Sequence, residues 1–72
     1  MAITRTRYNR IKVVLAEKGK SNNDLAEFLG VEASTVSNYV TNARQPTVER
    51  LFVIAKFLGV EARELISLNN DL

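Results

Sequence analysis

The residues with the clearest capacity for chemistry form a short set near the middle of the chain. They carry small, uncharged side chains that suit contact with base edges: Ala33, Ser34, Ser37 and Asn38. An asparagine amide pairs bidentately with adenine, serine hydroxyls serve several bases, and an alanine methyl contacts the thymine methyl. The chemistry indicated is hydrogen bonding without any covalent step. Taken alone, the four positions are more simply explained as solvated helix residues.

Two short helices joined by a tight turn are predicted to position this set. Ser21 is suited to cap the first helix, and Asp24 places negative charge near the positive helix end. Gly30 can end that helix in a left-handed conformation. The second helix is predicted to run from residue 32 or 33 to about 41, with inward residues at helical spacing: Val36, Tyr39 and Val40. This layout is a helix-turn-helix, whose second helix fits the major groove of DNA.

The stretch LAEFLGVEASTVSNYVTNARQP, continuing into LFVIAKFLGVEARELI, resembles the phage-repressor and Cro-like (XRE-type) helix-turn-helix family. Members of that family are usually bacterial or phage transcription regulators. The resemblance covers about residues 11–66. Residues at family spacing are Leu25, Ala26, Gly30, Val36, Ser37, Pro46, Leu51, Ile54, Ala55, Leu58, Gly59, Val60 and Leu65. The resemblance implies an all-α, compact five-helix lambda-repressor-like DNA-binding domain with the helix-turn-helix at helices 2 and 3.

The resemblance also implies which residues meet DNA. Base contacts made by the second motif helix match Ala33, Ser34 and Asn38. Phosphates are held at the start of the first motif helix and after the second. With Thr35 added, the phosphate set is Asn22, Asn23, Thr35, Thr41, Asn42 and Arg44. Arg44, at the tip of a polar loop closed by Pro46, is the strongest phosphate candidate, and Gln45 is a weaker one.

Three positions depart from the family pattern. Glu32 stands where Ser or Thr usually caps the reading helix beside a phosphate, and its charge suits the helix dipole but repels DNA. Asn42 replaces a loop glycine, and Asn tolerates the left-handed conformation better than most residues. Leu15 and Val40 replace a buried Arg and Glu pair, so an apolar contact is expected there without loss of stability.

Composition limits the chain to one small helical domain. It has 72 residues, 46% of them hydrophobic, with one proline and three glycines. There is no cysteine, which fits a reducing compartment. The N-terminus lacks the apolar core of a signal peptide, and no apolar run approaches the length of a membrane span. A cytoplasmic location without membrane contact is therefore expected.

Charge is distributed unevenly along the chain. Residues 1–20 hold six basic side chains and one acidic one, whereas residues 21–72 hold four basic and seven acidic ones. Residues 1–7 lack periodicity and are predicted to be a flexible basic arm. Its Arg5 and Arg7 are candidate contacts to a DNA backbone or minor groove. The alternative for this segment is a solvated, frayed terminus.

The remaining elements complete a domain predicted over residues 8–68, with a tail at 69–72. The first helix is predicted over 8–18, the fourth over 47–58 and a short fifth over 61–67. Inward residues of the first helix are Ile11, Val14 and Leu15. Those of the first motif helix are Leu25, Ala26, Phe28 and Leu29. Those of the fourth are Val48, Leu51, Ile54, Ala55 and Leu58.

The fourth helix is apolar around much of its circumference, which indicates cover on most sides. Phe52, Val53 and Phe57 lie off its core stripe. A homodimer is therefore predicted, with a candidate interface of Phe52, Val53, Phe57, Ile66 and Leu68. The alternative is that the fifth helix and the chain end fold over Phe52 or Phe57.

Enzyme chemistry finds little support in the sequence. Without His or Cys, the commonest general base, the thiol nucleophile and the commonest transition-metal ligands are missing. The three glycines sit at predicted helix ends and form no phosphate loop. No enzyme activity, metal, cofactor or small-molecule ligand is expected.

The favoured function is a sequence-specific regulator that binds double-stranded DNA as a dimer on a palindromic operator. The leading alternative is a protein-interaction module on the same fold, such as an antitoxin-like or regulatory partner. Glu32, the neutral reading helix and the net charge of only +2 motivate that alternative. A weaker third alternative is that residues 1–20 bind an acidic membrane surface. The apolar face of the first helix would then contact lipid, although the core needs it.

Overall fold

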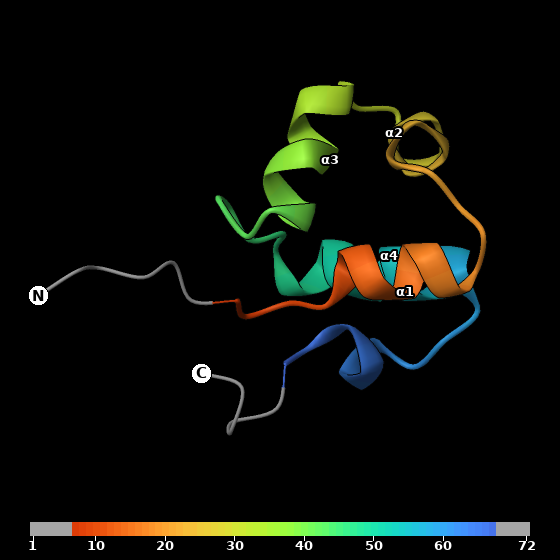
Figure 1. Ribbon diagram of the computed structural model, residues 1–72, viewed down its shortest axis with the longest axis vertical. Coiled ribbons are helices and arrows are strands. Elements are labelled where there is room, and N and C mark those ends of the chain that lie inside the picture. Colours follow the sequence, from red (N-terminus) through yellow and green to blue (C-terminus); the bar gives the residue numbers. More distant parts are fainter. Residues whose placement is uncertain (1–6, 68–72) are drawn as a thin grey trace, which may run out of the picture.

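The computed structural model describes residues 7–67 (Figure 1). Over this range the chain is helical, as the sequence predicts. Its elements are α1 (Ile11–Glu17), α2 (Asn22–Leu29), α3 (Ala33–Val40), α4 (Val48–Leu58) and a 3-10 turn, η1 (Ala62–Leu65). The predicted fifth helix is thus a single 3-10 turn. In Figure 1, α2 and α3 lie above α1 and α4, and η1 lies below them.

One apolar core joins all five elements. Its buried side chains are Ile11, Val14, Leu15, Leu25, Ala26, Val36, Tyr39, Val40, Ile54, Ala55, Leu58 and Leu65. Leu15 and Val40, which replace the family's Arg and Glu pair, both belong to it and are thus confirmed as apolar core residues. Two inward predictions are wrong. Val48 is 73% exposed because the first turn of α4 extends beyond the core. Phe28 is 51% exposed, because it packs on Phe57 at the edge of the domain and not in the core.

The helix-turn-helix begins and ends where the sequence predicts. The Ser21 hydroxyl accepts from the Asp24 N–H at 3.1 Å, and the Asp24 carboxylate accepts from the Ser21 N–H at 2.9 Å. This reciprocal capping box fixes the start of α2. Gly30 ends α2 with φ of +69°, a conformation that a Cβ would strain. The chain then enters α3 within three residues, with Glu32 as its N-cap.

The first helix starts later than predicted, at Ile11 instead of about residue 8. Asn9 pairs with Ile66 in an isolated antiparallel bridge, so the chain before α1 is extended. Two backbone bonds flank the bridge: the Arg10 N–H donates to the Leu65 carbonyl at 2.8 Å, and the Ser67 N–H donates to that of Tyr8 at 2.9 Å. These bonds to the C-terminal segment replace those of a further helical turn.

The C-terminal segment also differs from the predicted helix over 61–67. Glu61 and Glu64 form a capping box around η1, and the chain becomes extended at Ile66 to pair with Asn9. Most of the predicted basic arm, including Arg5, lies outside the described residues, as do Leu68 and the predicted tail at 69–72. Across residues 7–67, no helix is both long enough and apolar enough to cross a membrane.

Candidate nucleic-acid interface

The outer face of α3 presents the predicted base-contacting residues. Ala33, Ser34 and Ser37 are exposed, and Asn38 is half-buried at the edge of the same face. Within residues 7–67 the side chains of Ser34, Ser37 and Asn38 form no hydrogen bond to protein, so their polar groups remain available. The opposite face of α3 packs into the core through Val36, which is fully buried, so the helix is held in one orientation.

A polar hollow lies where α3 runs into the following loop. Its volume is about 670 Å³, and it is lined by Thr35, Asn38, Tyr39, Arg44 and Gln45. The structure thus brings together two predicted phosphate contacts, Thr35 and Arg44, beside a predicted base contact, Asn38. The Arg44 N–H donates to the Asn38 carbonyl at 3.1 Å, which ties the loop to the end of the helix.

Two other predicted phosphate contacts in this loop have partners inside the protein. The Thr41 hydroxyl donates to the Ser37 carbonyl at 2.9 Å. Asn42 is only 6% exposed, and its side chain bonds to both backbone groups of Asn9. Asn42 does adopt the left-handed conformation expected of a glycine replacement, with φ of +62°. Its side chain therefore shapes the loop and is not aimed at a phosphate.

Asn9 is a buried polar residue that the sequence interpretation missed. It is 7% exposed, and its amide nitrogen donates to the Tyr39 carbonyl at 3.0 Å and to Gln45 Oε1 at 2.7 Å. The predicted helix over 8–18 placed Asn9 in its first turn, and no periodicity in the sequence marks this position as buried. Its partners lie 30 or more residues away, a separation that local sequence patterns do not encode.

The first turn of α2 contains the remaining predicted phosphate contacts, Asn22 and Asn23, both exposed. They follow the Ser21 cap at the positive end of the helix dipole, which favours a bound anion. The backbone N–H of Ser21, then its side chain, and the charge of Lys20 lower the pKa of the Asp24 carboxyl at this end. The Asp24 carboxylate is therefore part of the N-terminal cap of α2.

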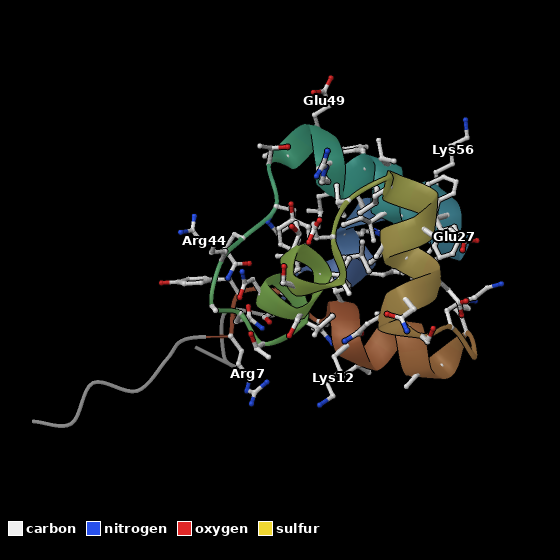
Figure 2. All side chains as sticks on the ribbon, turned by 90° about the horizontal axis from the view of Figure 1, so that it is seen from above. Arg7, Lys12, Glu27, Arg44, Glu49 and Lys56 are labelled. Atoms are coloured by element: carbon white, nitrogen blue, oxygen red, sulfur yellow. The ribbon has the colours of Figure 1, made fainter. Side chains whose placement is uncertain are left out.

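Figure 2 labels six charged side chains, which project in different directions. Arg44 projects at the left, and Arg7 and Lys12 project at the lower edge of the view. Glu27, from α2, lies at the right, and Glu49 and Lys56, from α4, project toward the top. The predicted arm contact Arg7 and the loop contact Arg44 therefore project away from the labelled side chains of α4. Lys12, in α1, is a third such cation, one that the sequence interpretation did not single out.

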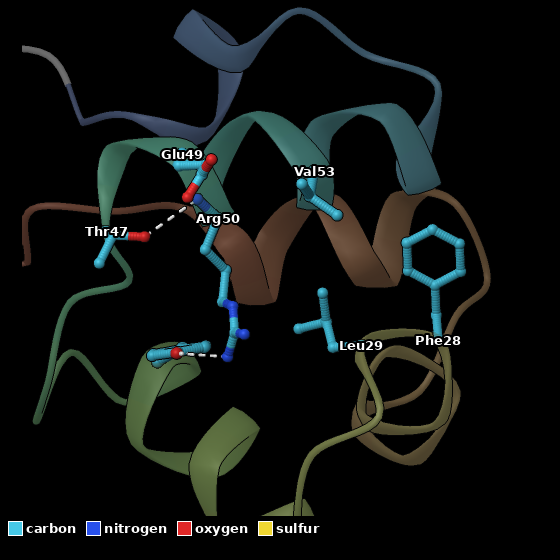
Figure 3. Close-up of a pocket in the computed structure, with 7 residues that line it drawn as sticks. Phe28, Leu29, Thr47, Glu49, Arg50 and Val53 are labelled. Atoms are coloured by element: carbon cyan, nitrogen blue, oxygen red, sulfur yellow. Dashed lines mark hydrogen bonds between the residues drawn. The ribbon is translucent and has the colours of Figure 1, made fainter.

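A second hollow lies between α2, α3 and α4, with a volume of about 600 Å³ (Figure 3). Arg50 extends into it from α4 and donates to the Tyr39 hydroxyl at 3.4 Å. The Arg50 N–H donates to the Thr47 hydroxyl at 3.0 Å, which caps α4. The Arg50–Tyr39 bond links α4 to α3. Among the described residues there is no cluster of three or more His, Cys, Asp or Glu that could hold a metal ion.

The predicted dimer residues divide into different environments. Phe52 is 62% exposed and Val53 is 41% exposed, and the wrongly assigned Val48 adds to this apolar surface of α4. Phe57 is partly buried: its ring centroid lies 4.6 Å from that of Phe28, and Lys20 Nζ lies 5.6 Å from it. Thus α2 and the α1–α2 loop cover Phe57. Ile66 remains half-exposed in the bridge to Asn9.

Comparison with known proteins agrees with this architecture. A crystal structure of a protein from Bacteroides fragilis, named as a candidate DNA-binding protein, is 45% identical to the chain. The two superpose with a TM-score of 0.83 over 83% of this chain and 97% of that one. No curated protein matches the sequence. The sequence model of the helix-turn-helix family matches residues 11–65, so the chain belongs to the helix-turn-helix family, in its phage-repressor and Cro-like branch.

Proposed function

We propose that this protein binds double-stranded DNA in a sequence-specific manner and regulates transcription by occupying an operator. The observation that carries the proposal is the outer face of α3, where the side chains of Ser34, Ser37 and Asn38 form no hydrogen bond among residues 7–67. Hydrogen-bonding groups on a rigid helix of this size suit base edges in the major groove. Family membership and the similarity to a candidate DNA-binding protein support the same function.

In this proposal the interface divides between base readout and phosphate contacts. Base contacts come from Ala33, Ser34, Ser37 and Asn38. Phosphate contacts come from the first turn of α2 and from the polar hollow, and they comprise Asn22, Asn23, Thr35 and Arg44, with Arg7 beside them. Phosphate contacts set orientation and affinity, whereas base contacts set sequence preference. Thr41 and Asn42 support the loop, since their side chains have partners inside the protein.

We further propose that the protein acts as a homodimer through the apolar surface of α4. Val48, Phe52 and Val53 form this surface, and an aromatic side chain with 62% exposure is well suited to anchor a second subunit. Two reading helices would then enter successive major grooves about 34 Å apart on an inverted repeat.

A second candidate function is a protein-interaction module on the same fold. Glu32 favours it, because this exposed carboxylate at the N-cap of α3 has no side-chain capping bond and adds negative charge to the proposed DNA face. Against it stand the exposed cations Arg7, Lys12 and Arg44.

Selection of bound sites from a random duplex library, at low and at physiological salt, tests the proposal. The expected result is an enriched inverted repeat whose half-sites lie about one helical turn apart. Binding should weaken with salt at a slope of about −0.9 per phosphate neutralised. Weak binding without enrichment at either salt concentration would contradict sequence-specific recognition and favour the protein-interaction module.

A further inference from the structure

Asn9 lies at a junction between three parts of the chain. It is 7% exposed, and each of its polar groups has a partner in the protein. Its side-chain oxygen accepts from the Ile11 N–H at 3.1 Å, and its amide nitrogen donates to the Tyr39 carbonyl and to Gln45. Its backbone N–H donates to Asn42 Oδ1 at 2.9 Å, and its carbonyl accepts from Asn42 Nδ2 at 3.2 Å. One residue therefore bonds to α1, to the last turn of α3 and to the loop after it.

Side-chain hydrogen bonds with Asn9 attach the loop that bears Arg44 to the N-terminal part of the domain. Asn42 holds a left-handed φ of +62° and bonds to Asn9 on one side and to Gln45 Nε2, at 3.1 Å, on the other. Within residues 7–67, the backbone N–H groups of residues 41, 42 and 44 donate to carbonyls of α3, those of Ser37, Tyr39 and Asn38. Asn9 thus ties both ends of the segment 42–45 to the N-terminal part of the chain.

Asn9 is itself held firmly enough to serve as an anchor. The backbone bonds of Arg10 to Leu65 and of Ser67 to Tyr8 lie on either side of it, and Asn9 bridges to Ile66. Leu65 is fully buried in the core. Since a buried amide left without partners is costly, the network favours one arrangement of the loop.

We propose that Asn9 is a positioning residue for DNA binding, acting through Arg44. By holding the segment 42–45, it keeps the Arg44 backbone against Asn38 and its side chain at the polar hollow shared with Thr35. The inference deepens the proposed function and rests on it for the DNA readout. The effect of Asn9 on the loop does not depend on DNA and can be measured in the free protein.

The variant Asn9→Asp separates the two jobs of the side chain. It keeps an oxygen to accept from the Ile11 N–H but sets a second oxygen against the Tyr39 carbonyl, where the amide now donates. The cap of α1 is retained, whereas the side-chain bonds to the Tyr39 carbonyl and to Gln45 are lost. The bonds between the Asn9 backbone and the Asn42 side chain remain in this variant. Asn42→Gly removes that second set of bonds, while glycine keeps the left-handed φ. Ile54→Val is the control for lost stability, since it removes a methyl group from the core and leaves all of these bonds in place.

Amide hydrogen exchange of the free variants measures the loop directly. The expected result is faster exchange at the Arg44 N–H in Asn9→Asp and in Asn42→Gly, by about tenfold or more, while α1 and α4 remain protected. Ile54→Val should raise exchange evenly across the domain. Equal Arg44 protection in all three variants, after correction for global stability, would overturn the proposal.

Duplex binding tests the functional consequence. Asn9→Asp and Asn42→Gly should each lower the magnitude of the salt slope by about one per subunit, the same change that is expected of Arg44→Ala. Combining either with Arg44→Ala should cause no further loss of affinity, because both act through the same contact. Additive losses with unchanged salt slopes would overturn the positioning role. If the wild-type protein bound no duplex, the proposed function would fail, whereas the exchange data would still decide whether Asn9 holds the loop.

Discussion

At the scale of single residues, alanine substitutions of Asn38 and of Arg44 are expected to weaken DNA binding in different ways. Asn38→Ala removes an amide on the base-reading face, so preference at one position of each half-site should fall by about 1–3 kcal/mol. Arg44→Ala removes a cation, so all sequences should bind more weakly and the salt slope should flatten by about one per subunit. Affinities for a panel of single-substitution sites, measured at several salt concentrations, separate these effects. Identical behaviour of the two variants across the panel would refute the assigned roles.

Asp24 is expected to make stability depend on pH at the start of α2. Its pKa in the folded protein is lowered, chiefly by the Ser21 backbone N–H. The stabilisation is therefore complete above the ordinary Asp pKa of about 3.9 and is lost as pH falls through the lower folded-state value. Thermal unfolding from pH 7 to pH 2 should show the gap between wild type and Asp24→Asn closing at the acidic end. A constant gap would exclude a contribution from the charge of Asp24.

The asparagines show how far sequence reasoning reaches at this scale. Asn38 and Asn42 were predictable, because helical periodicity places the first on the outer face and loop chemistry allows the second a positive φ. Asn9 was not, since its burial depends on partners 30 to 36 residues away in sequence. Polar side chains enter cores only where such distant partners satisfy them. Local patterns therefore identify the outward-facing part of the candidate site and miss its buried support.

At the scale of elements, boundaries set by local chemistry were predictable and those set by distant pairing were not. Ser21, Gly30 and Gly59 mark helix ends through side-chain caps or left-handed backbone, and the structure confirms each. The predicted start of α1 and the predicted helix over 61–67 were wrong, because Asn9 and Ile66 pair across the domain. The core stripe of α4 was correct except at Val48, since periodicity shows a face but not how far the neighbouring elements extend along it.

The N-cap of α3 is expected to limit both stability and DNA affinity. Glu32 accepts from the Thr35 N–H through its backbone only and offers no side-chain cap. Glu32→Ser should supply that cap and raise stability by about 0.5–1 kcal/mol. Glu32→Gln removes the charge without adding a good cap, so it should raise DNA affinity at low salt while leaving stability level or lower. Unfolding curves and duplex titrations at two salt concentrations distinguish the effect of the cap from the effect of the charge. Equal DNA affinity of the wild type and both variants at low salt would show that the Glu32 carboxylate does not repel the duplex.

At the scale of the whole molecule, the DNA side and the apolar side fall on different elements. Arg7, Lys12 and Arg44 project away from the labelled side chains of α4, whereas Val48 and Phe52 are exposed on α4 itself. Because α4 is fixed to α3 through the Arg50–Tyr39 bond and the shared core, a partner docked on α4 would set the spacing of two reading helices. In the proposed dimer, this separation would let one surface hold the partner subunit while the other contacts the operator.

The apolar surface of α4 gives the last prediction. Phe52→Ser should shift the protein toward a monomer, with dimerisation weakened by about 30-fold or more, the effect of losing an aromatic anchor at an interface. Val13→Ser is the matched control, since Val13 is an exposed apolar residue on α1, at 46%. Sedimentation over a concentration series measures the change. Affinity for a full inverted repeat should fall in Phe52→Ser, while affinity for an isolated half-site stays unchanged because α3 and its loop are untouched. A wild-type protein that sediments as a monomer at all concentrations and binds the full repeat no better than a half-site would contradict the dimer on this surface.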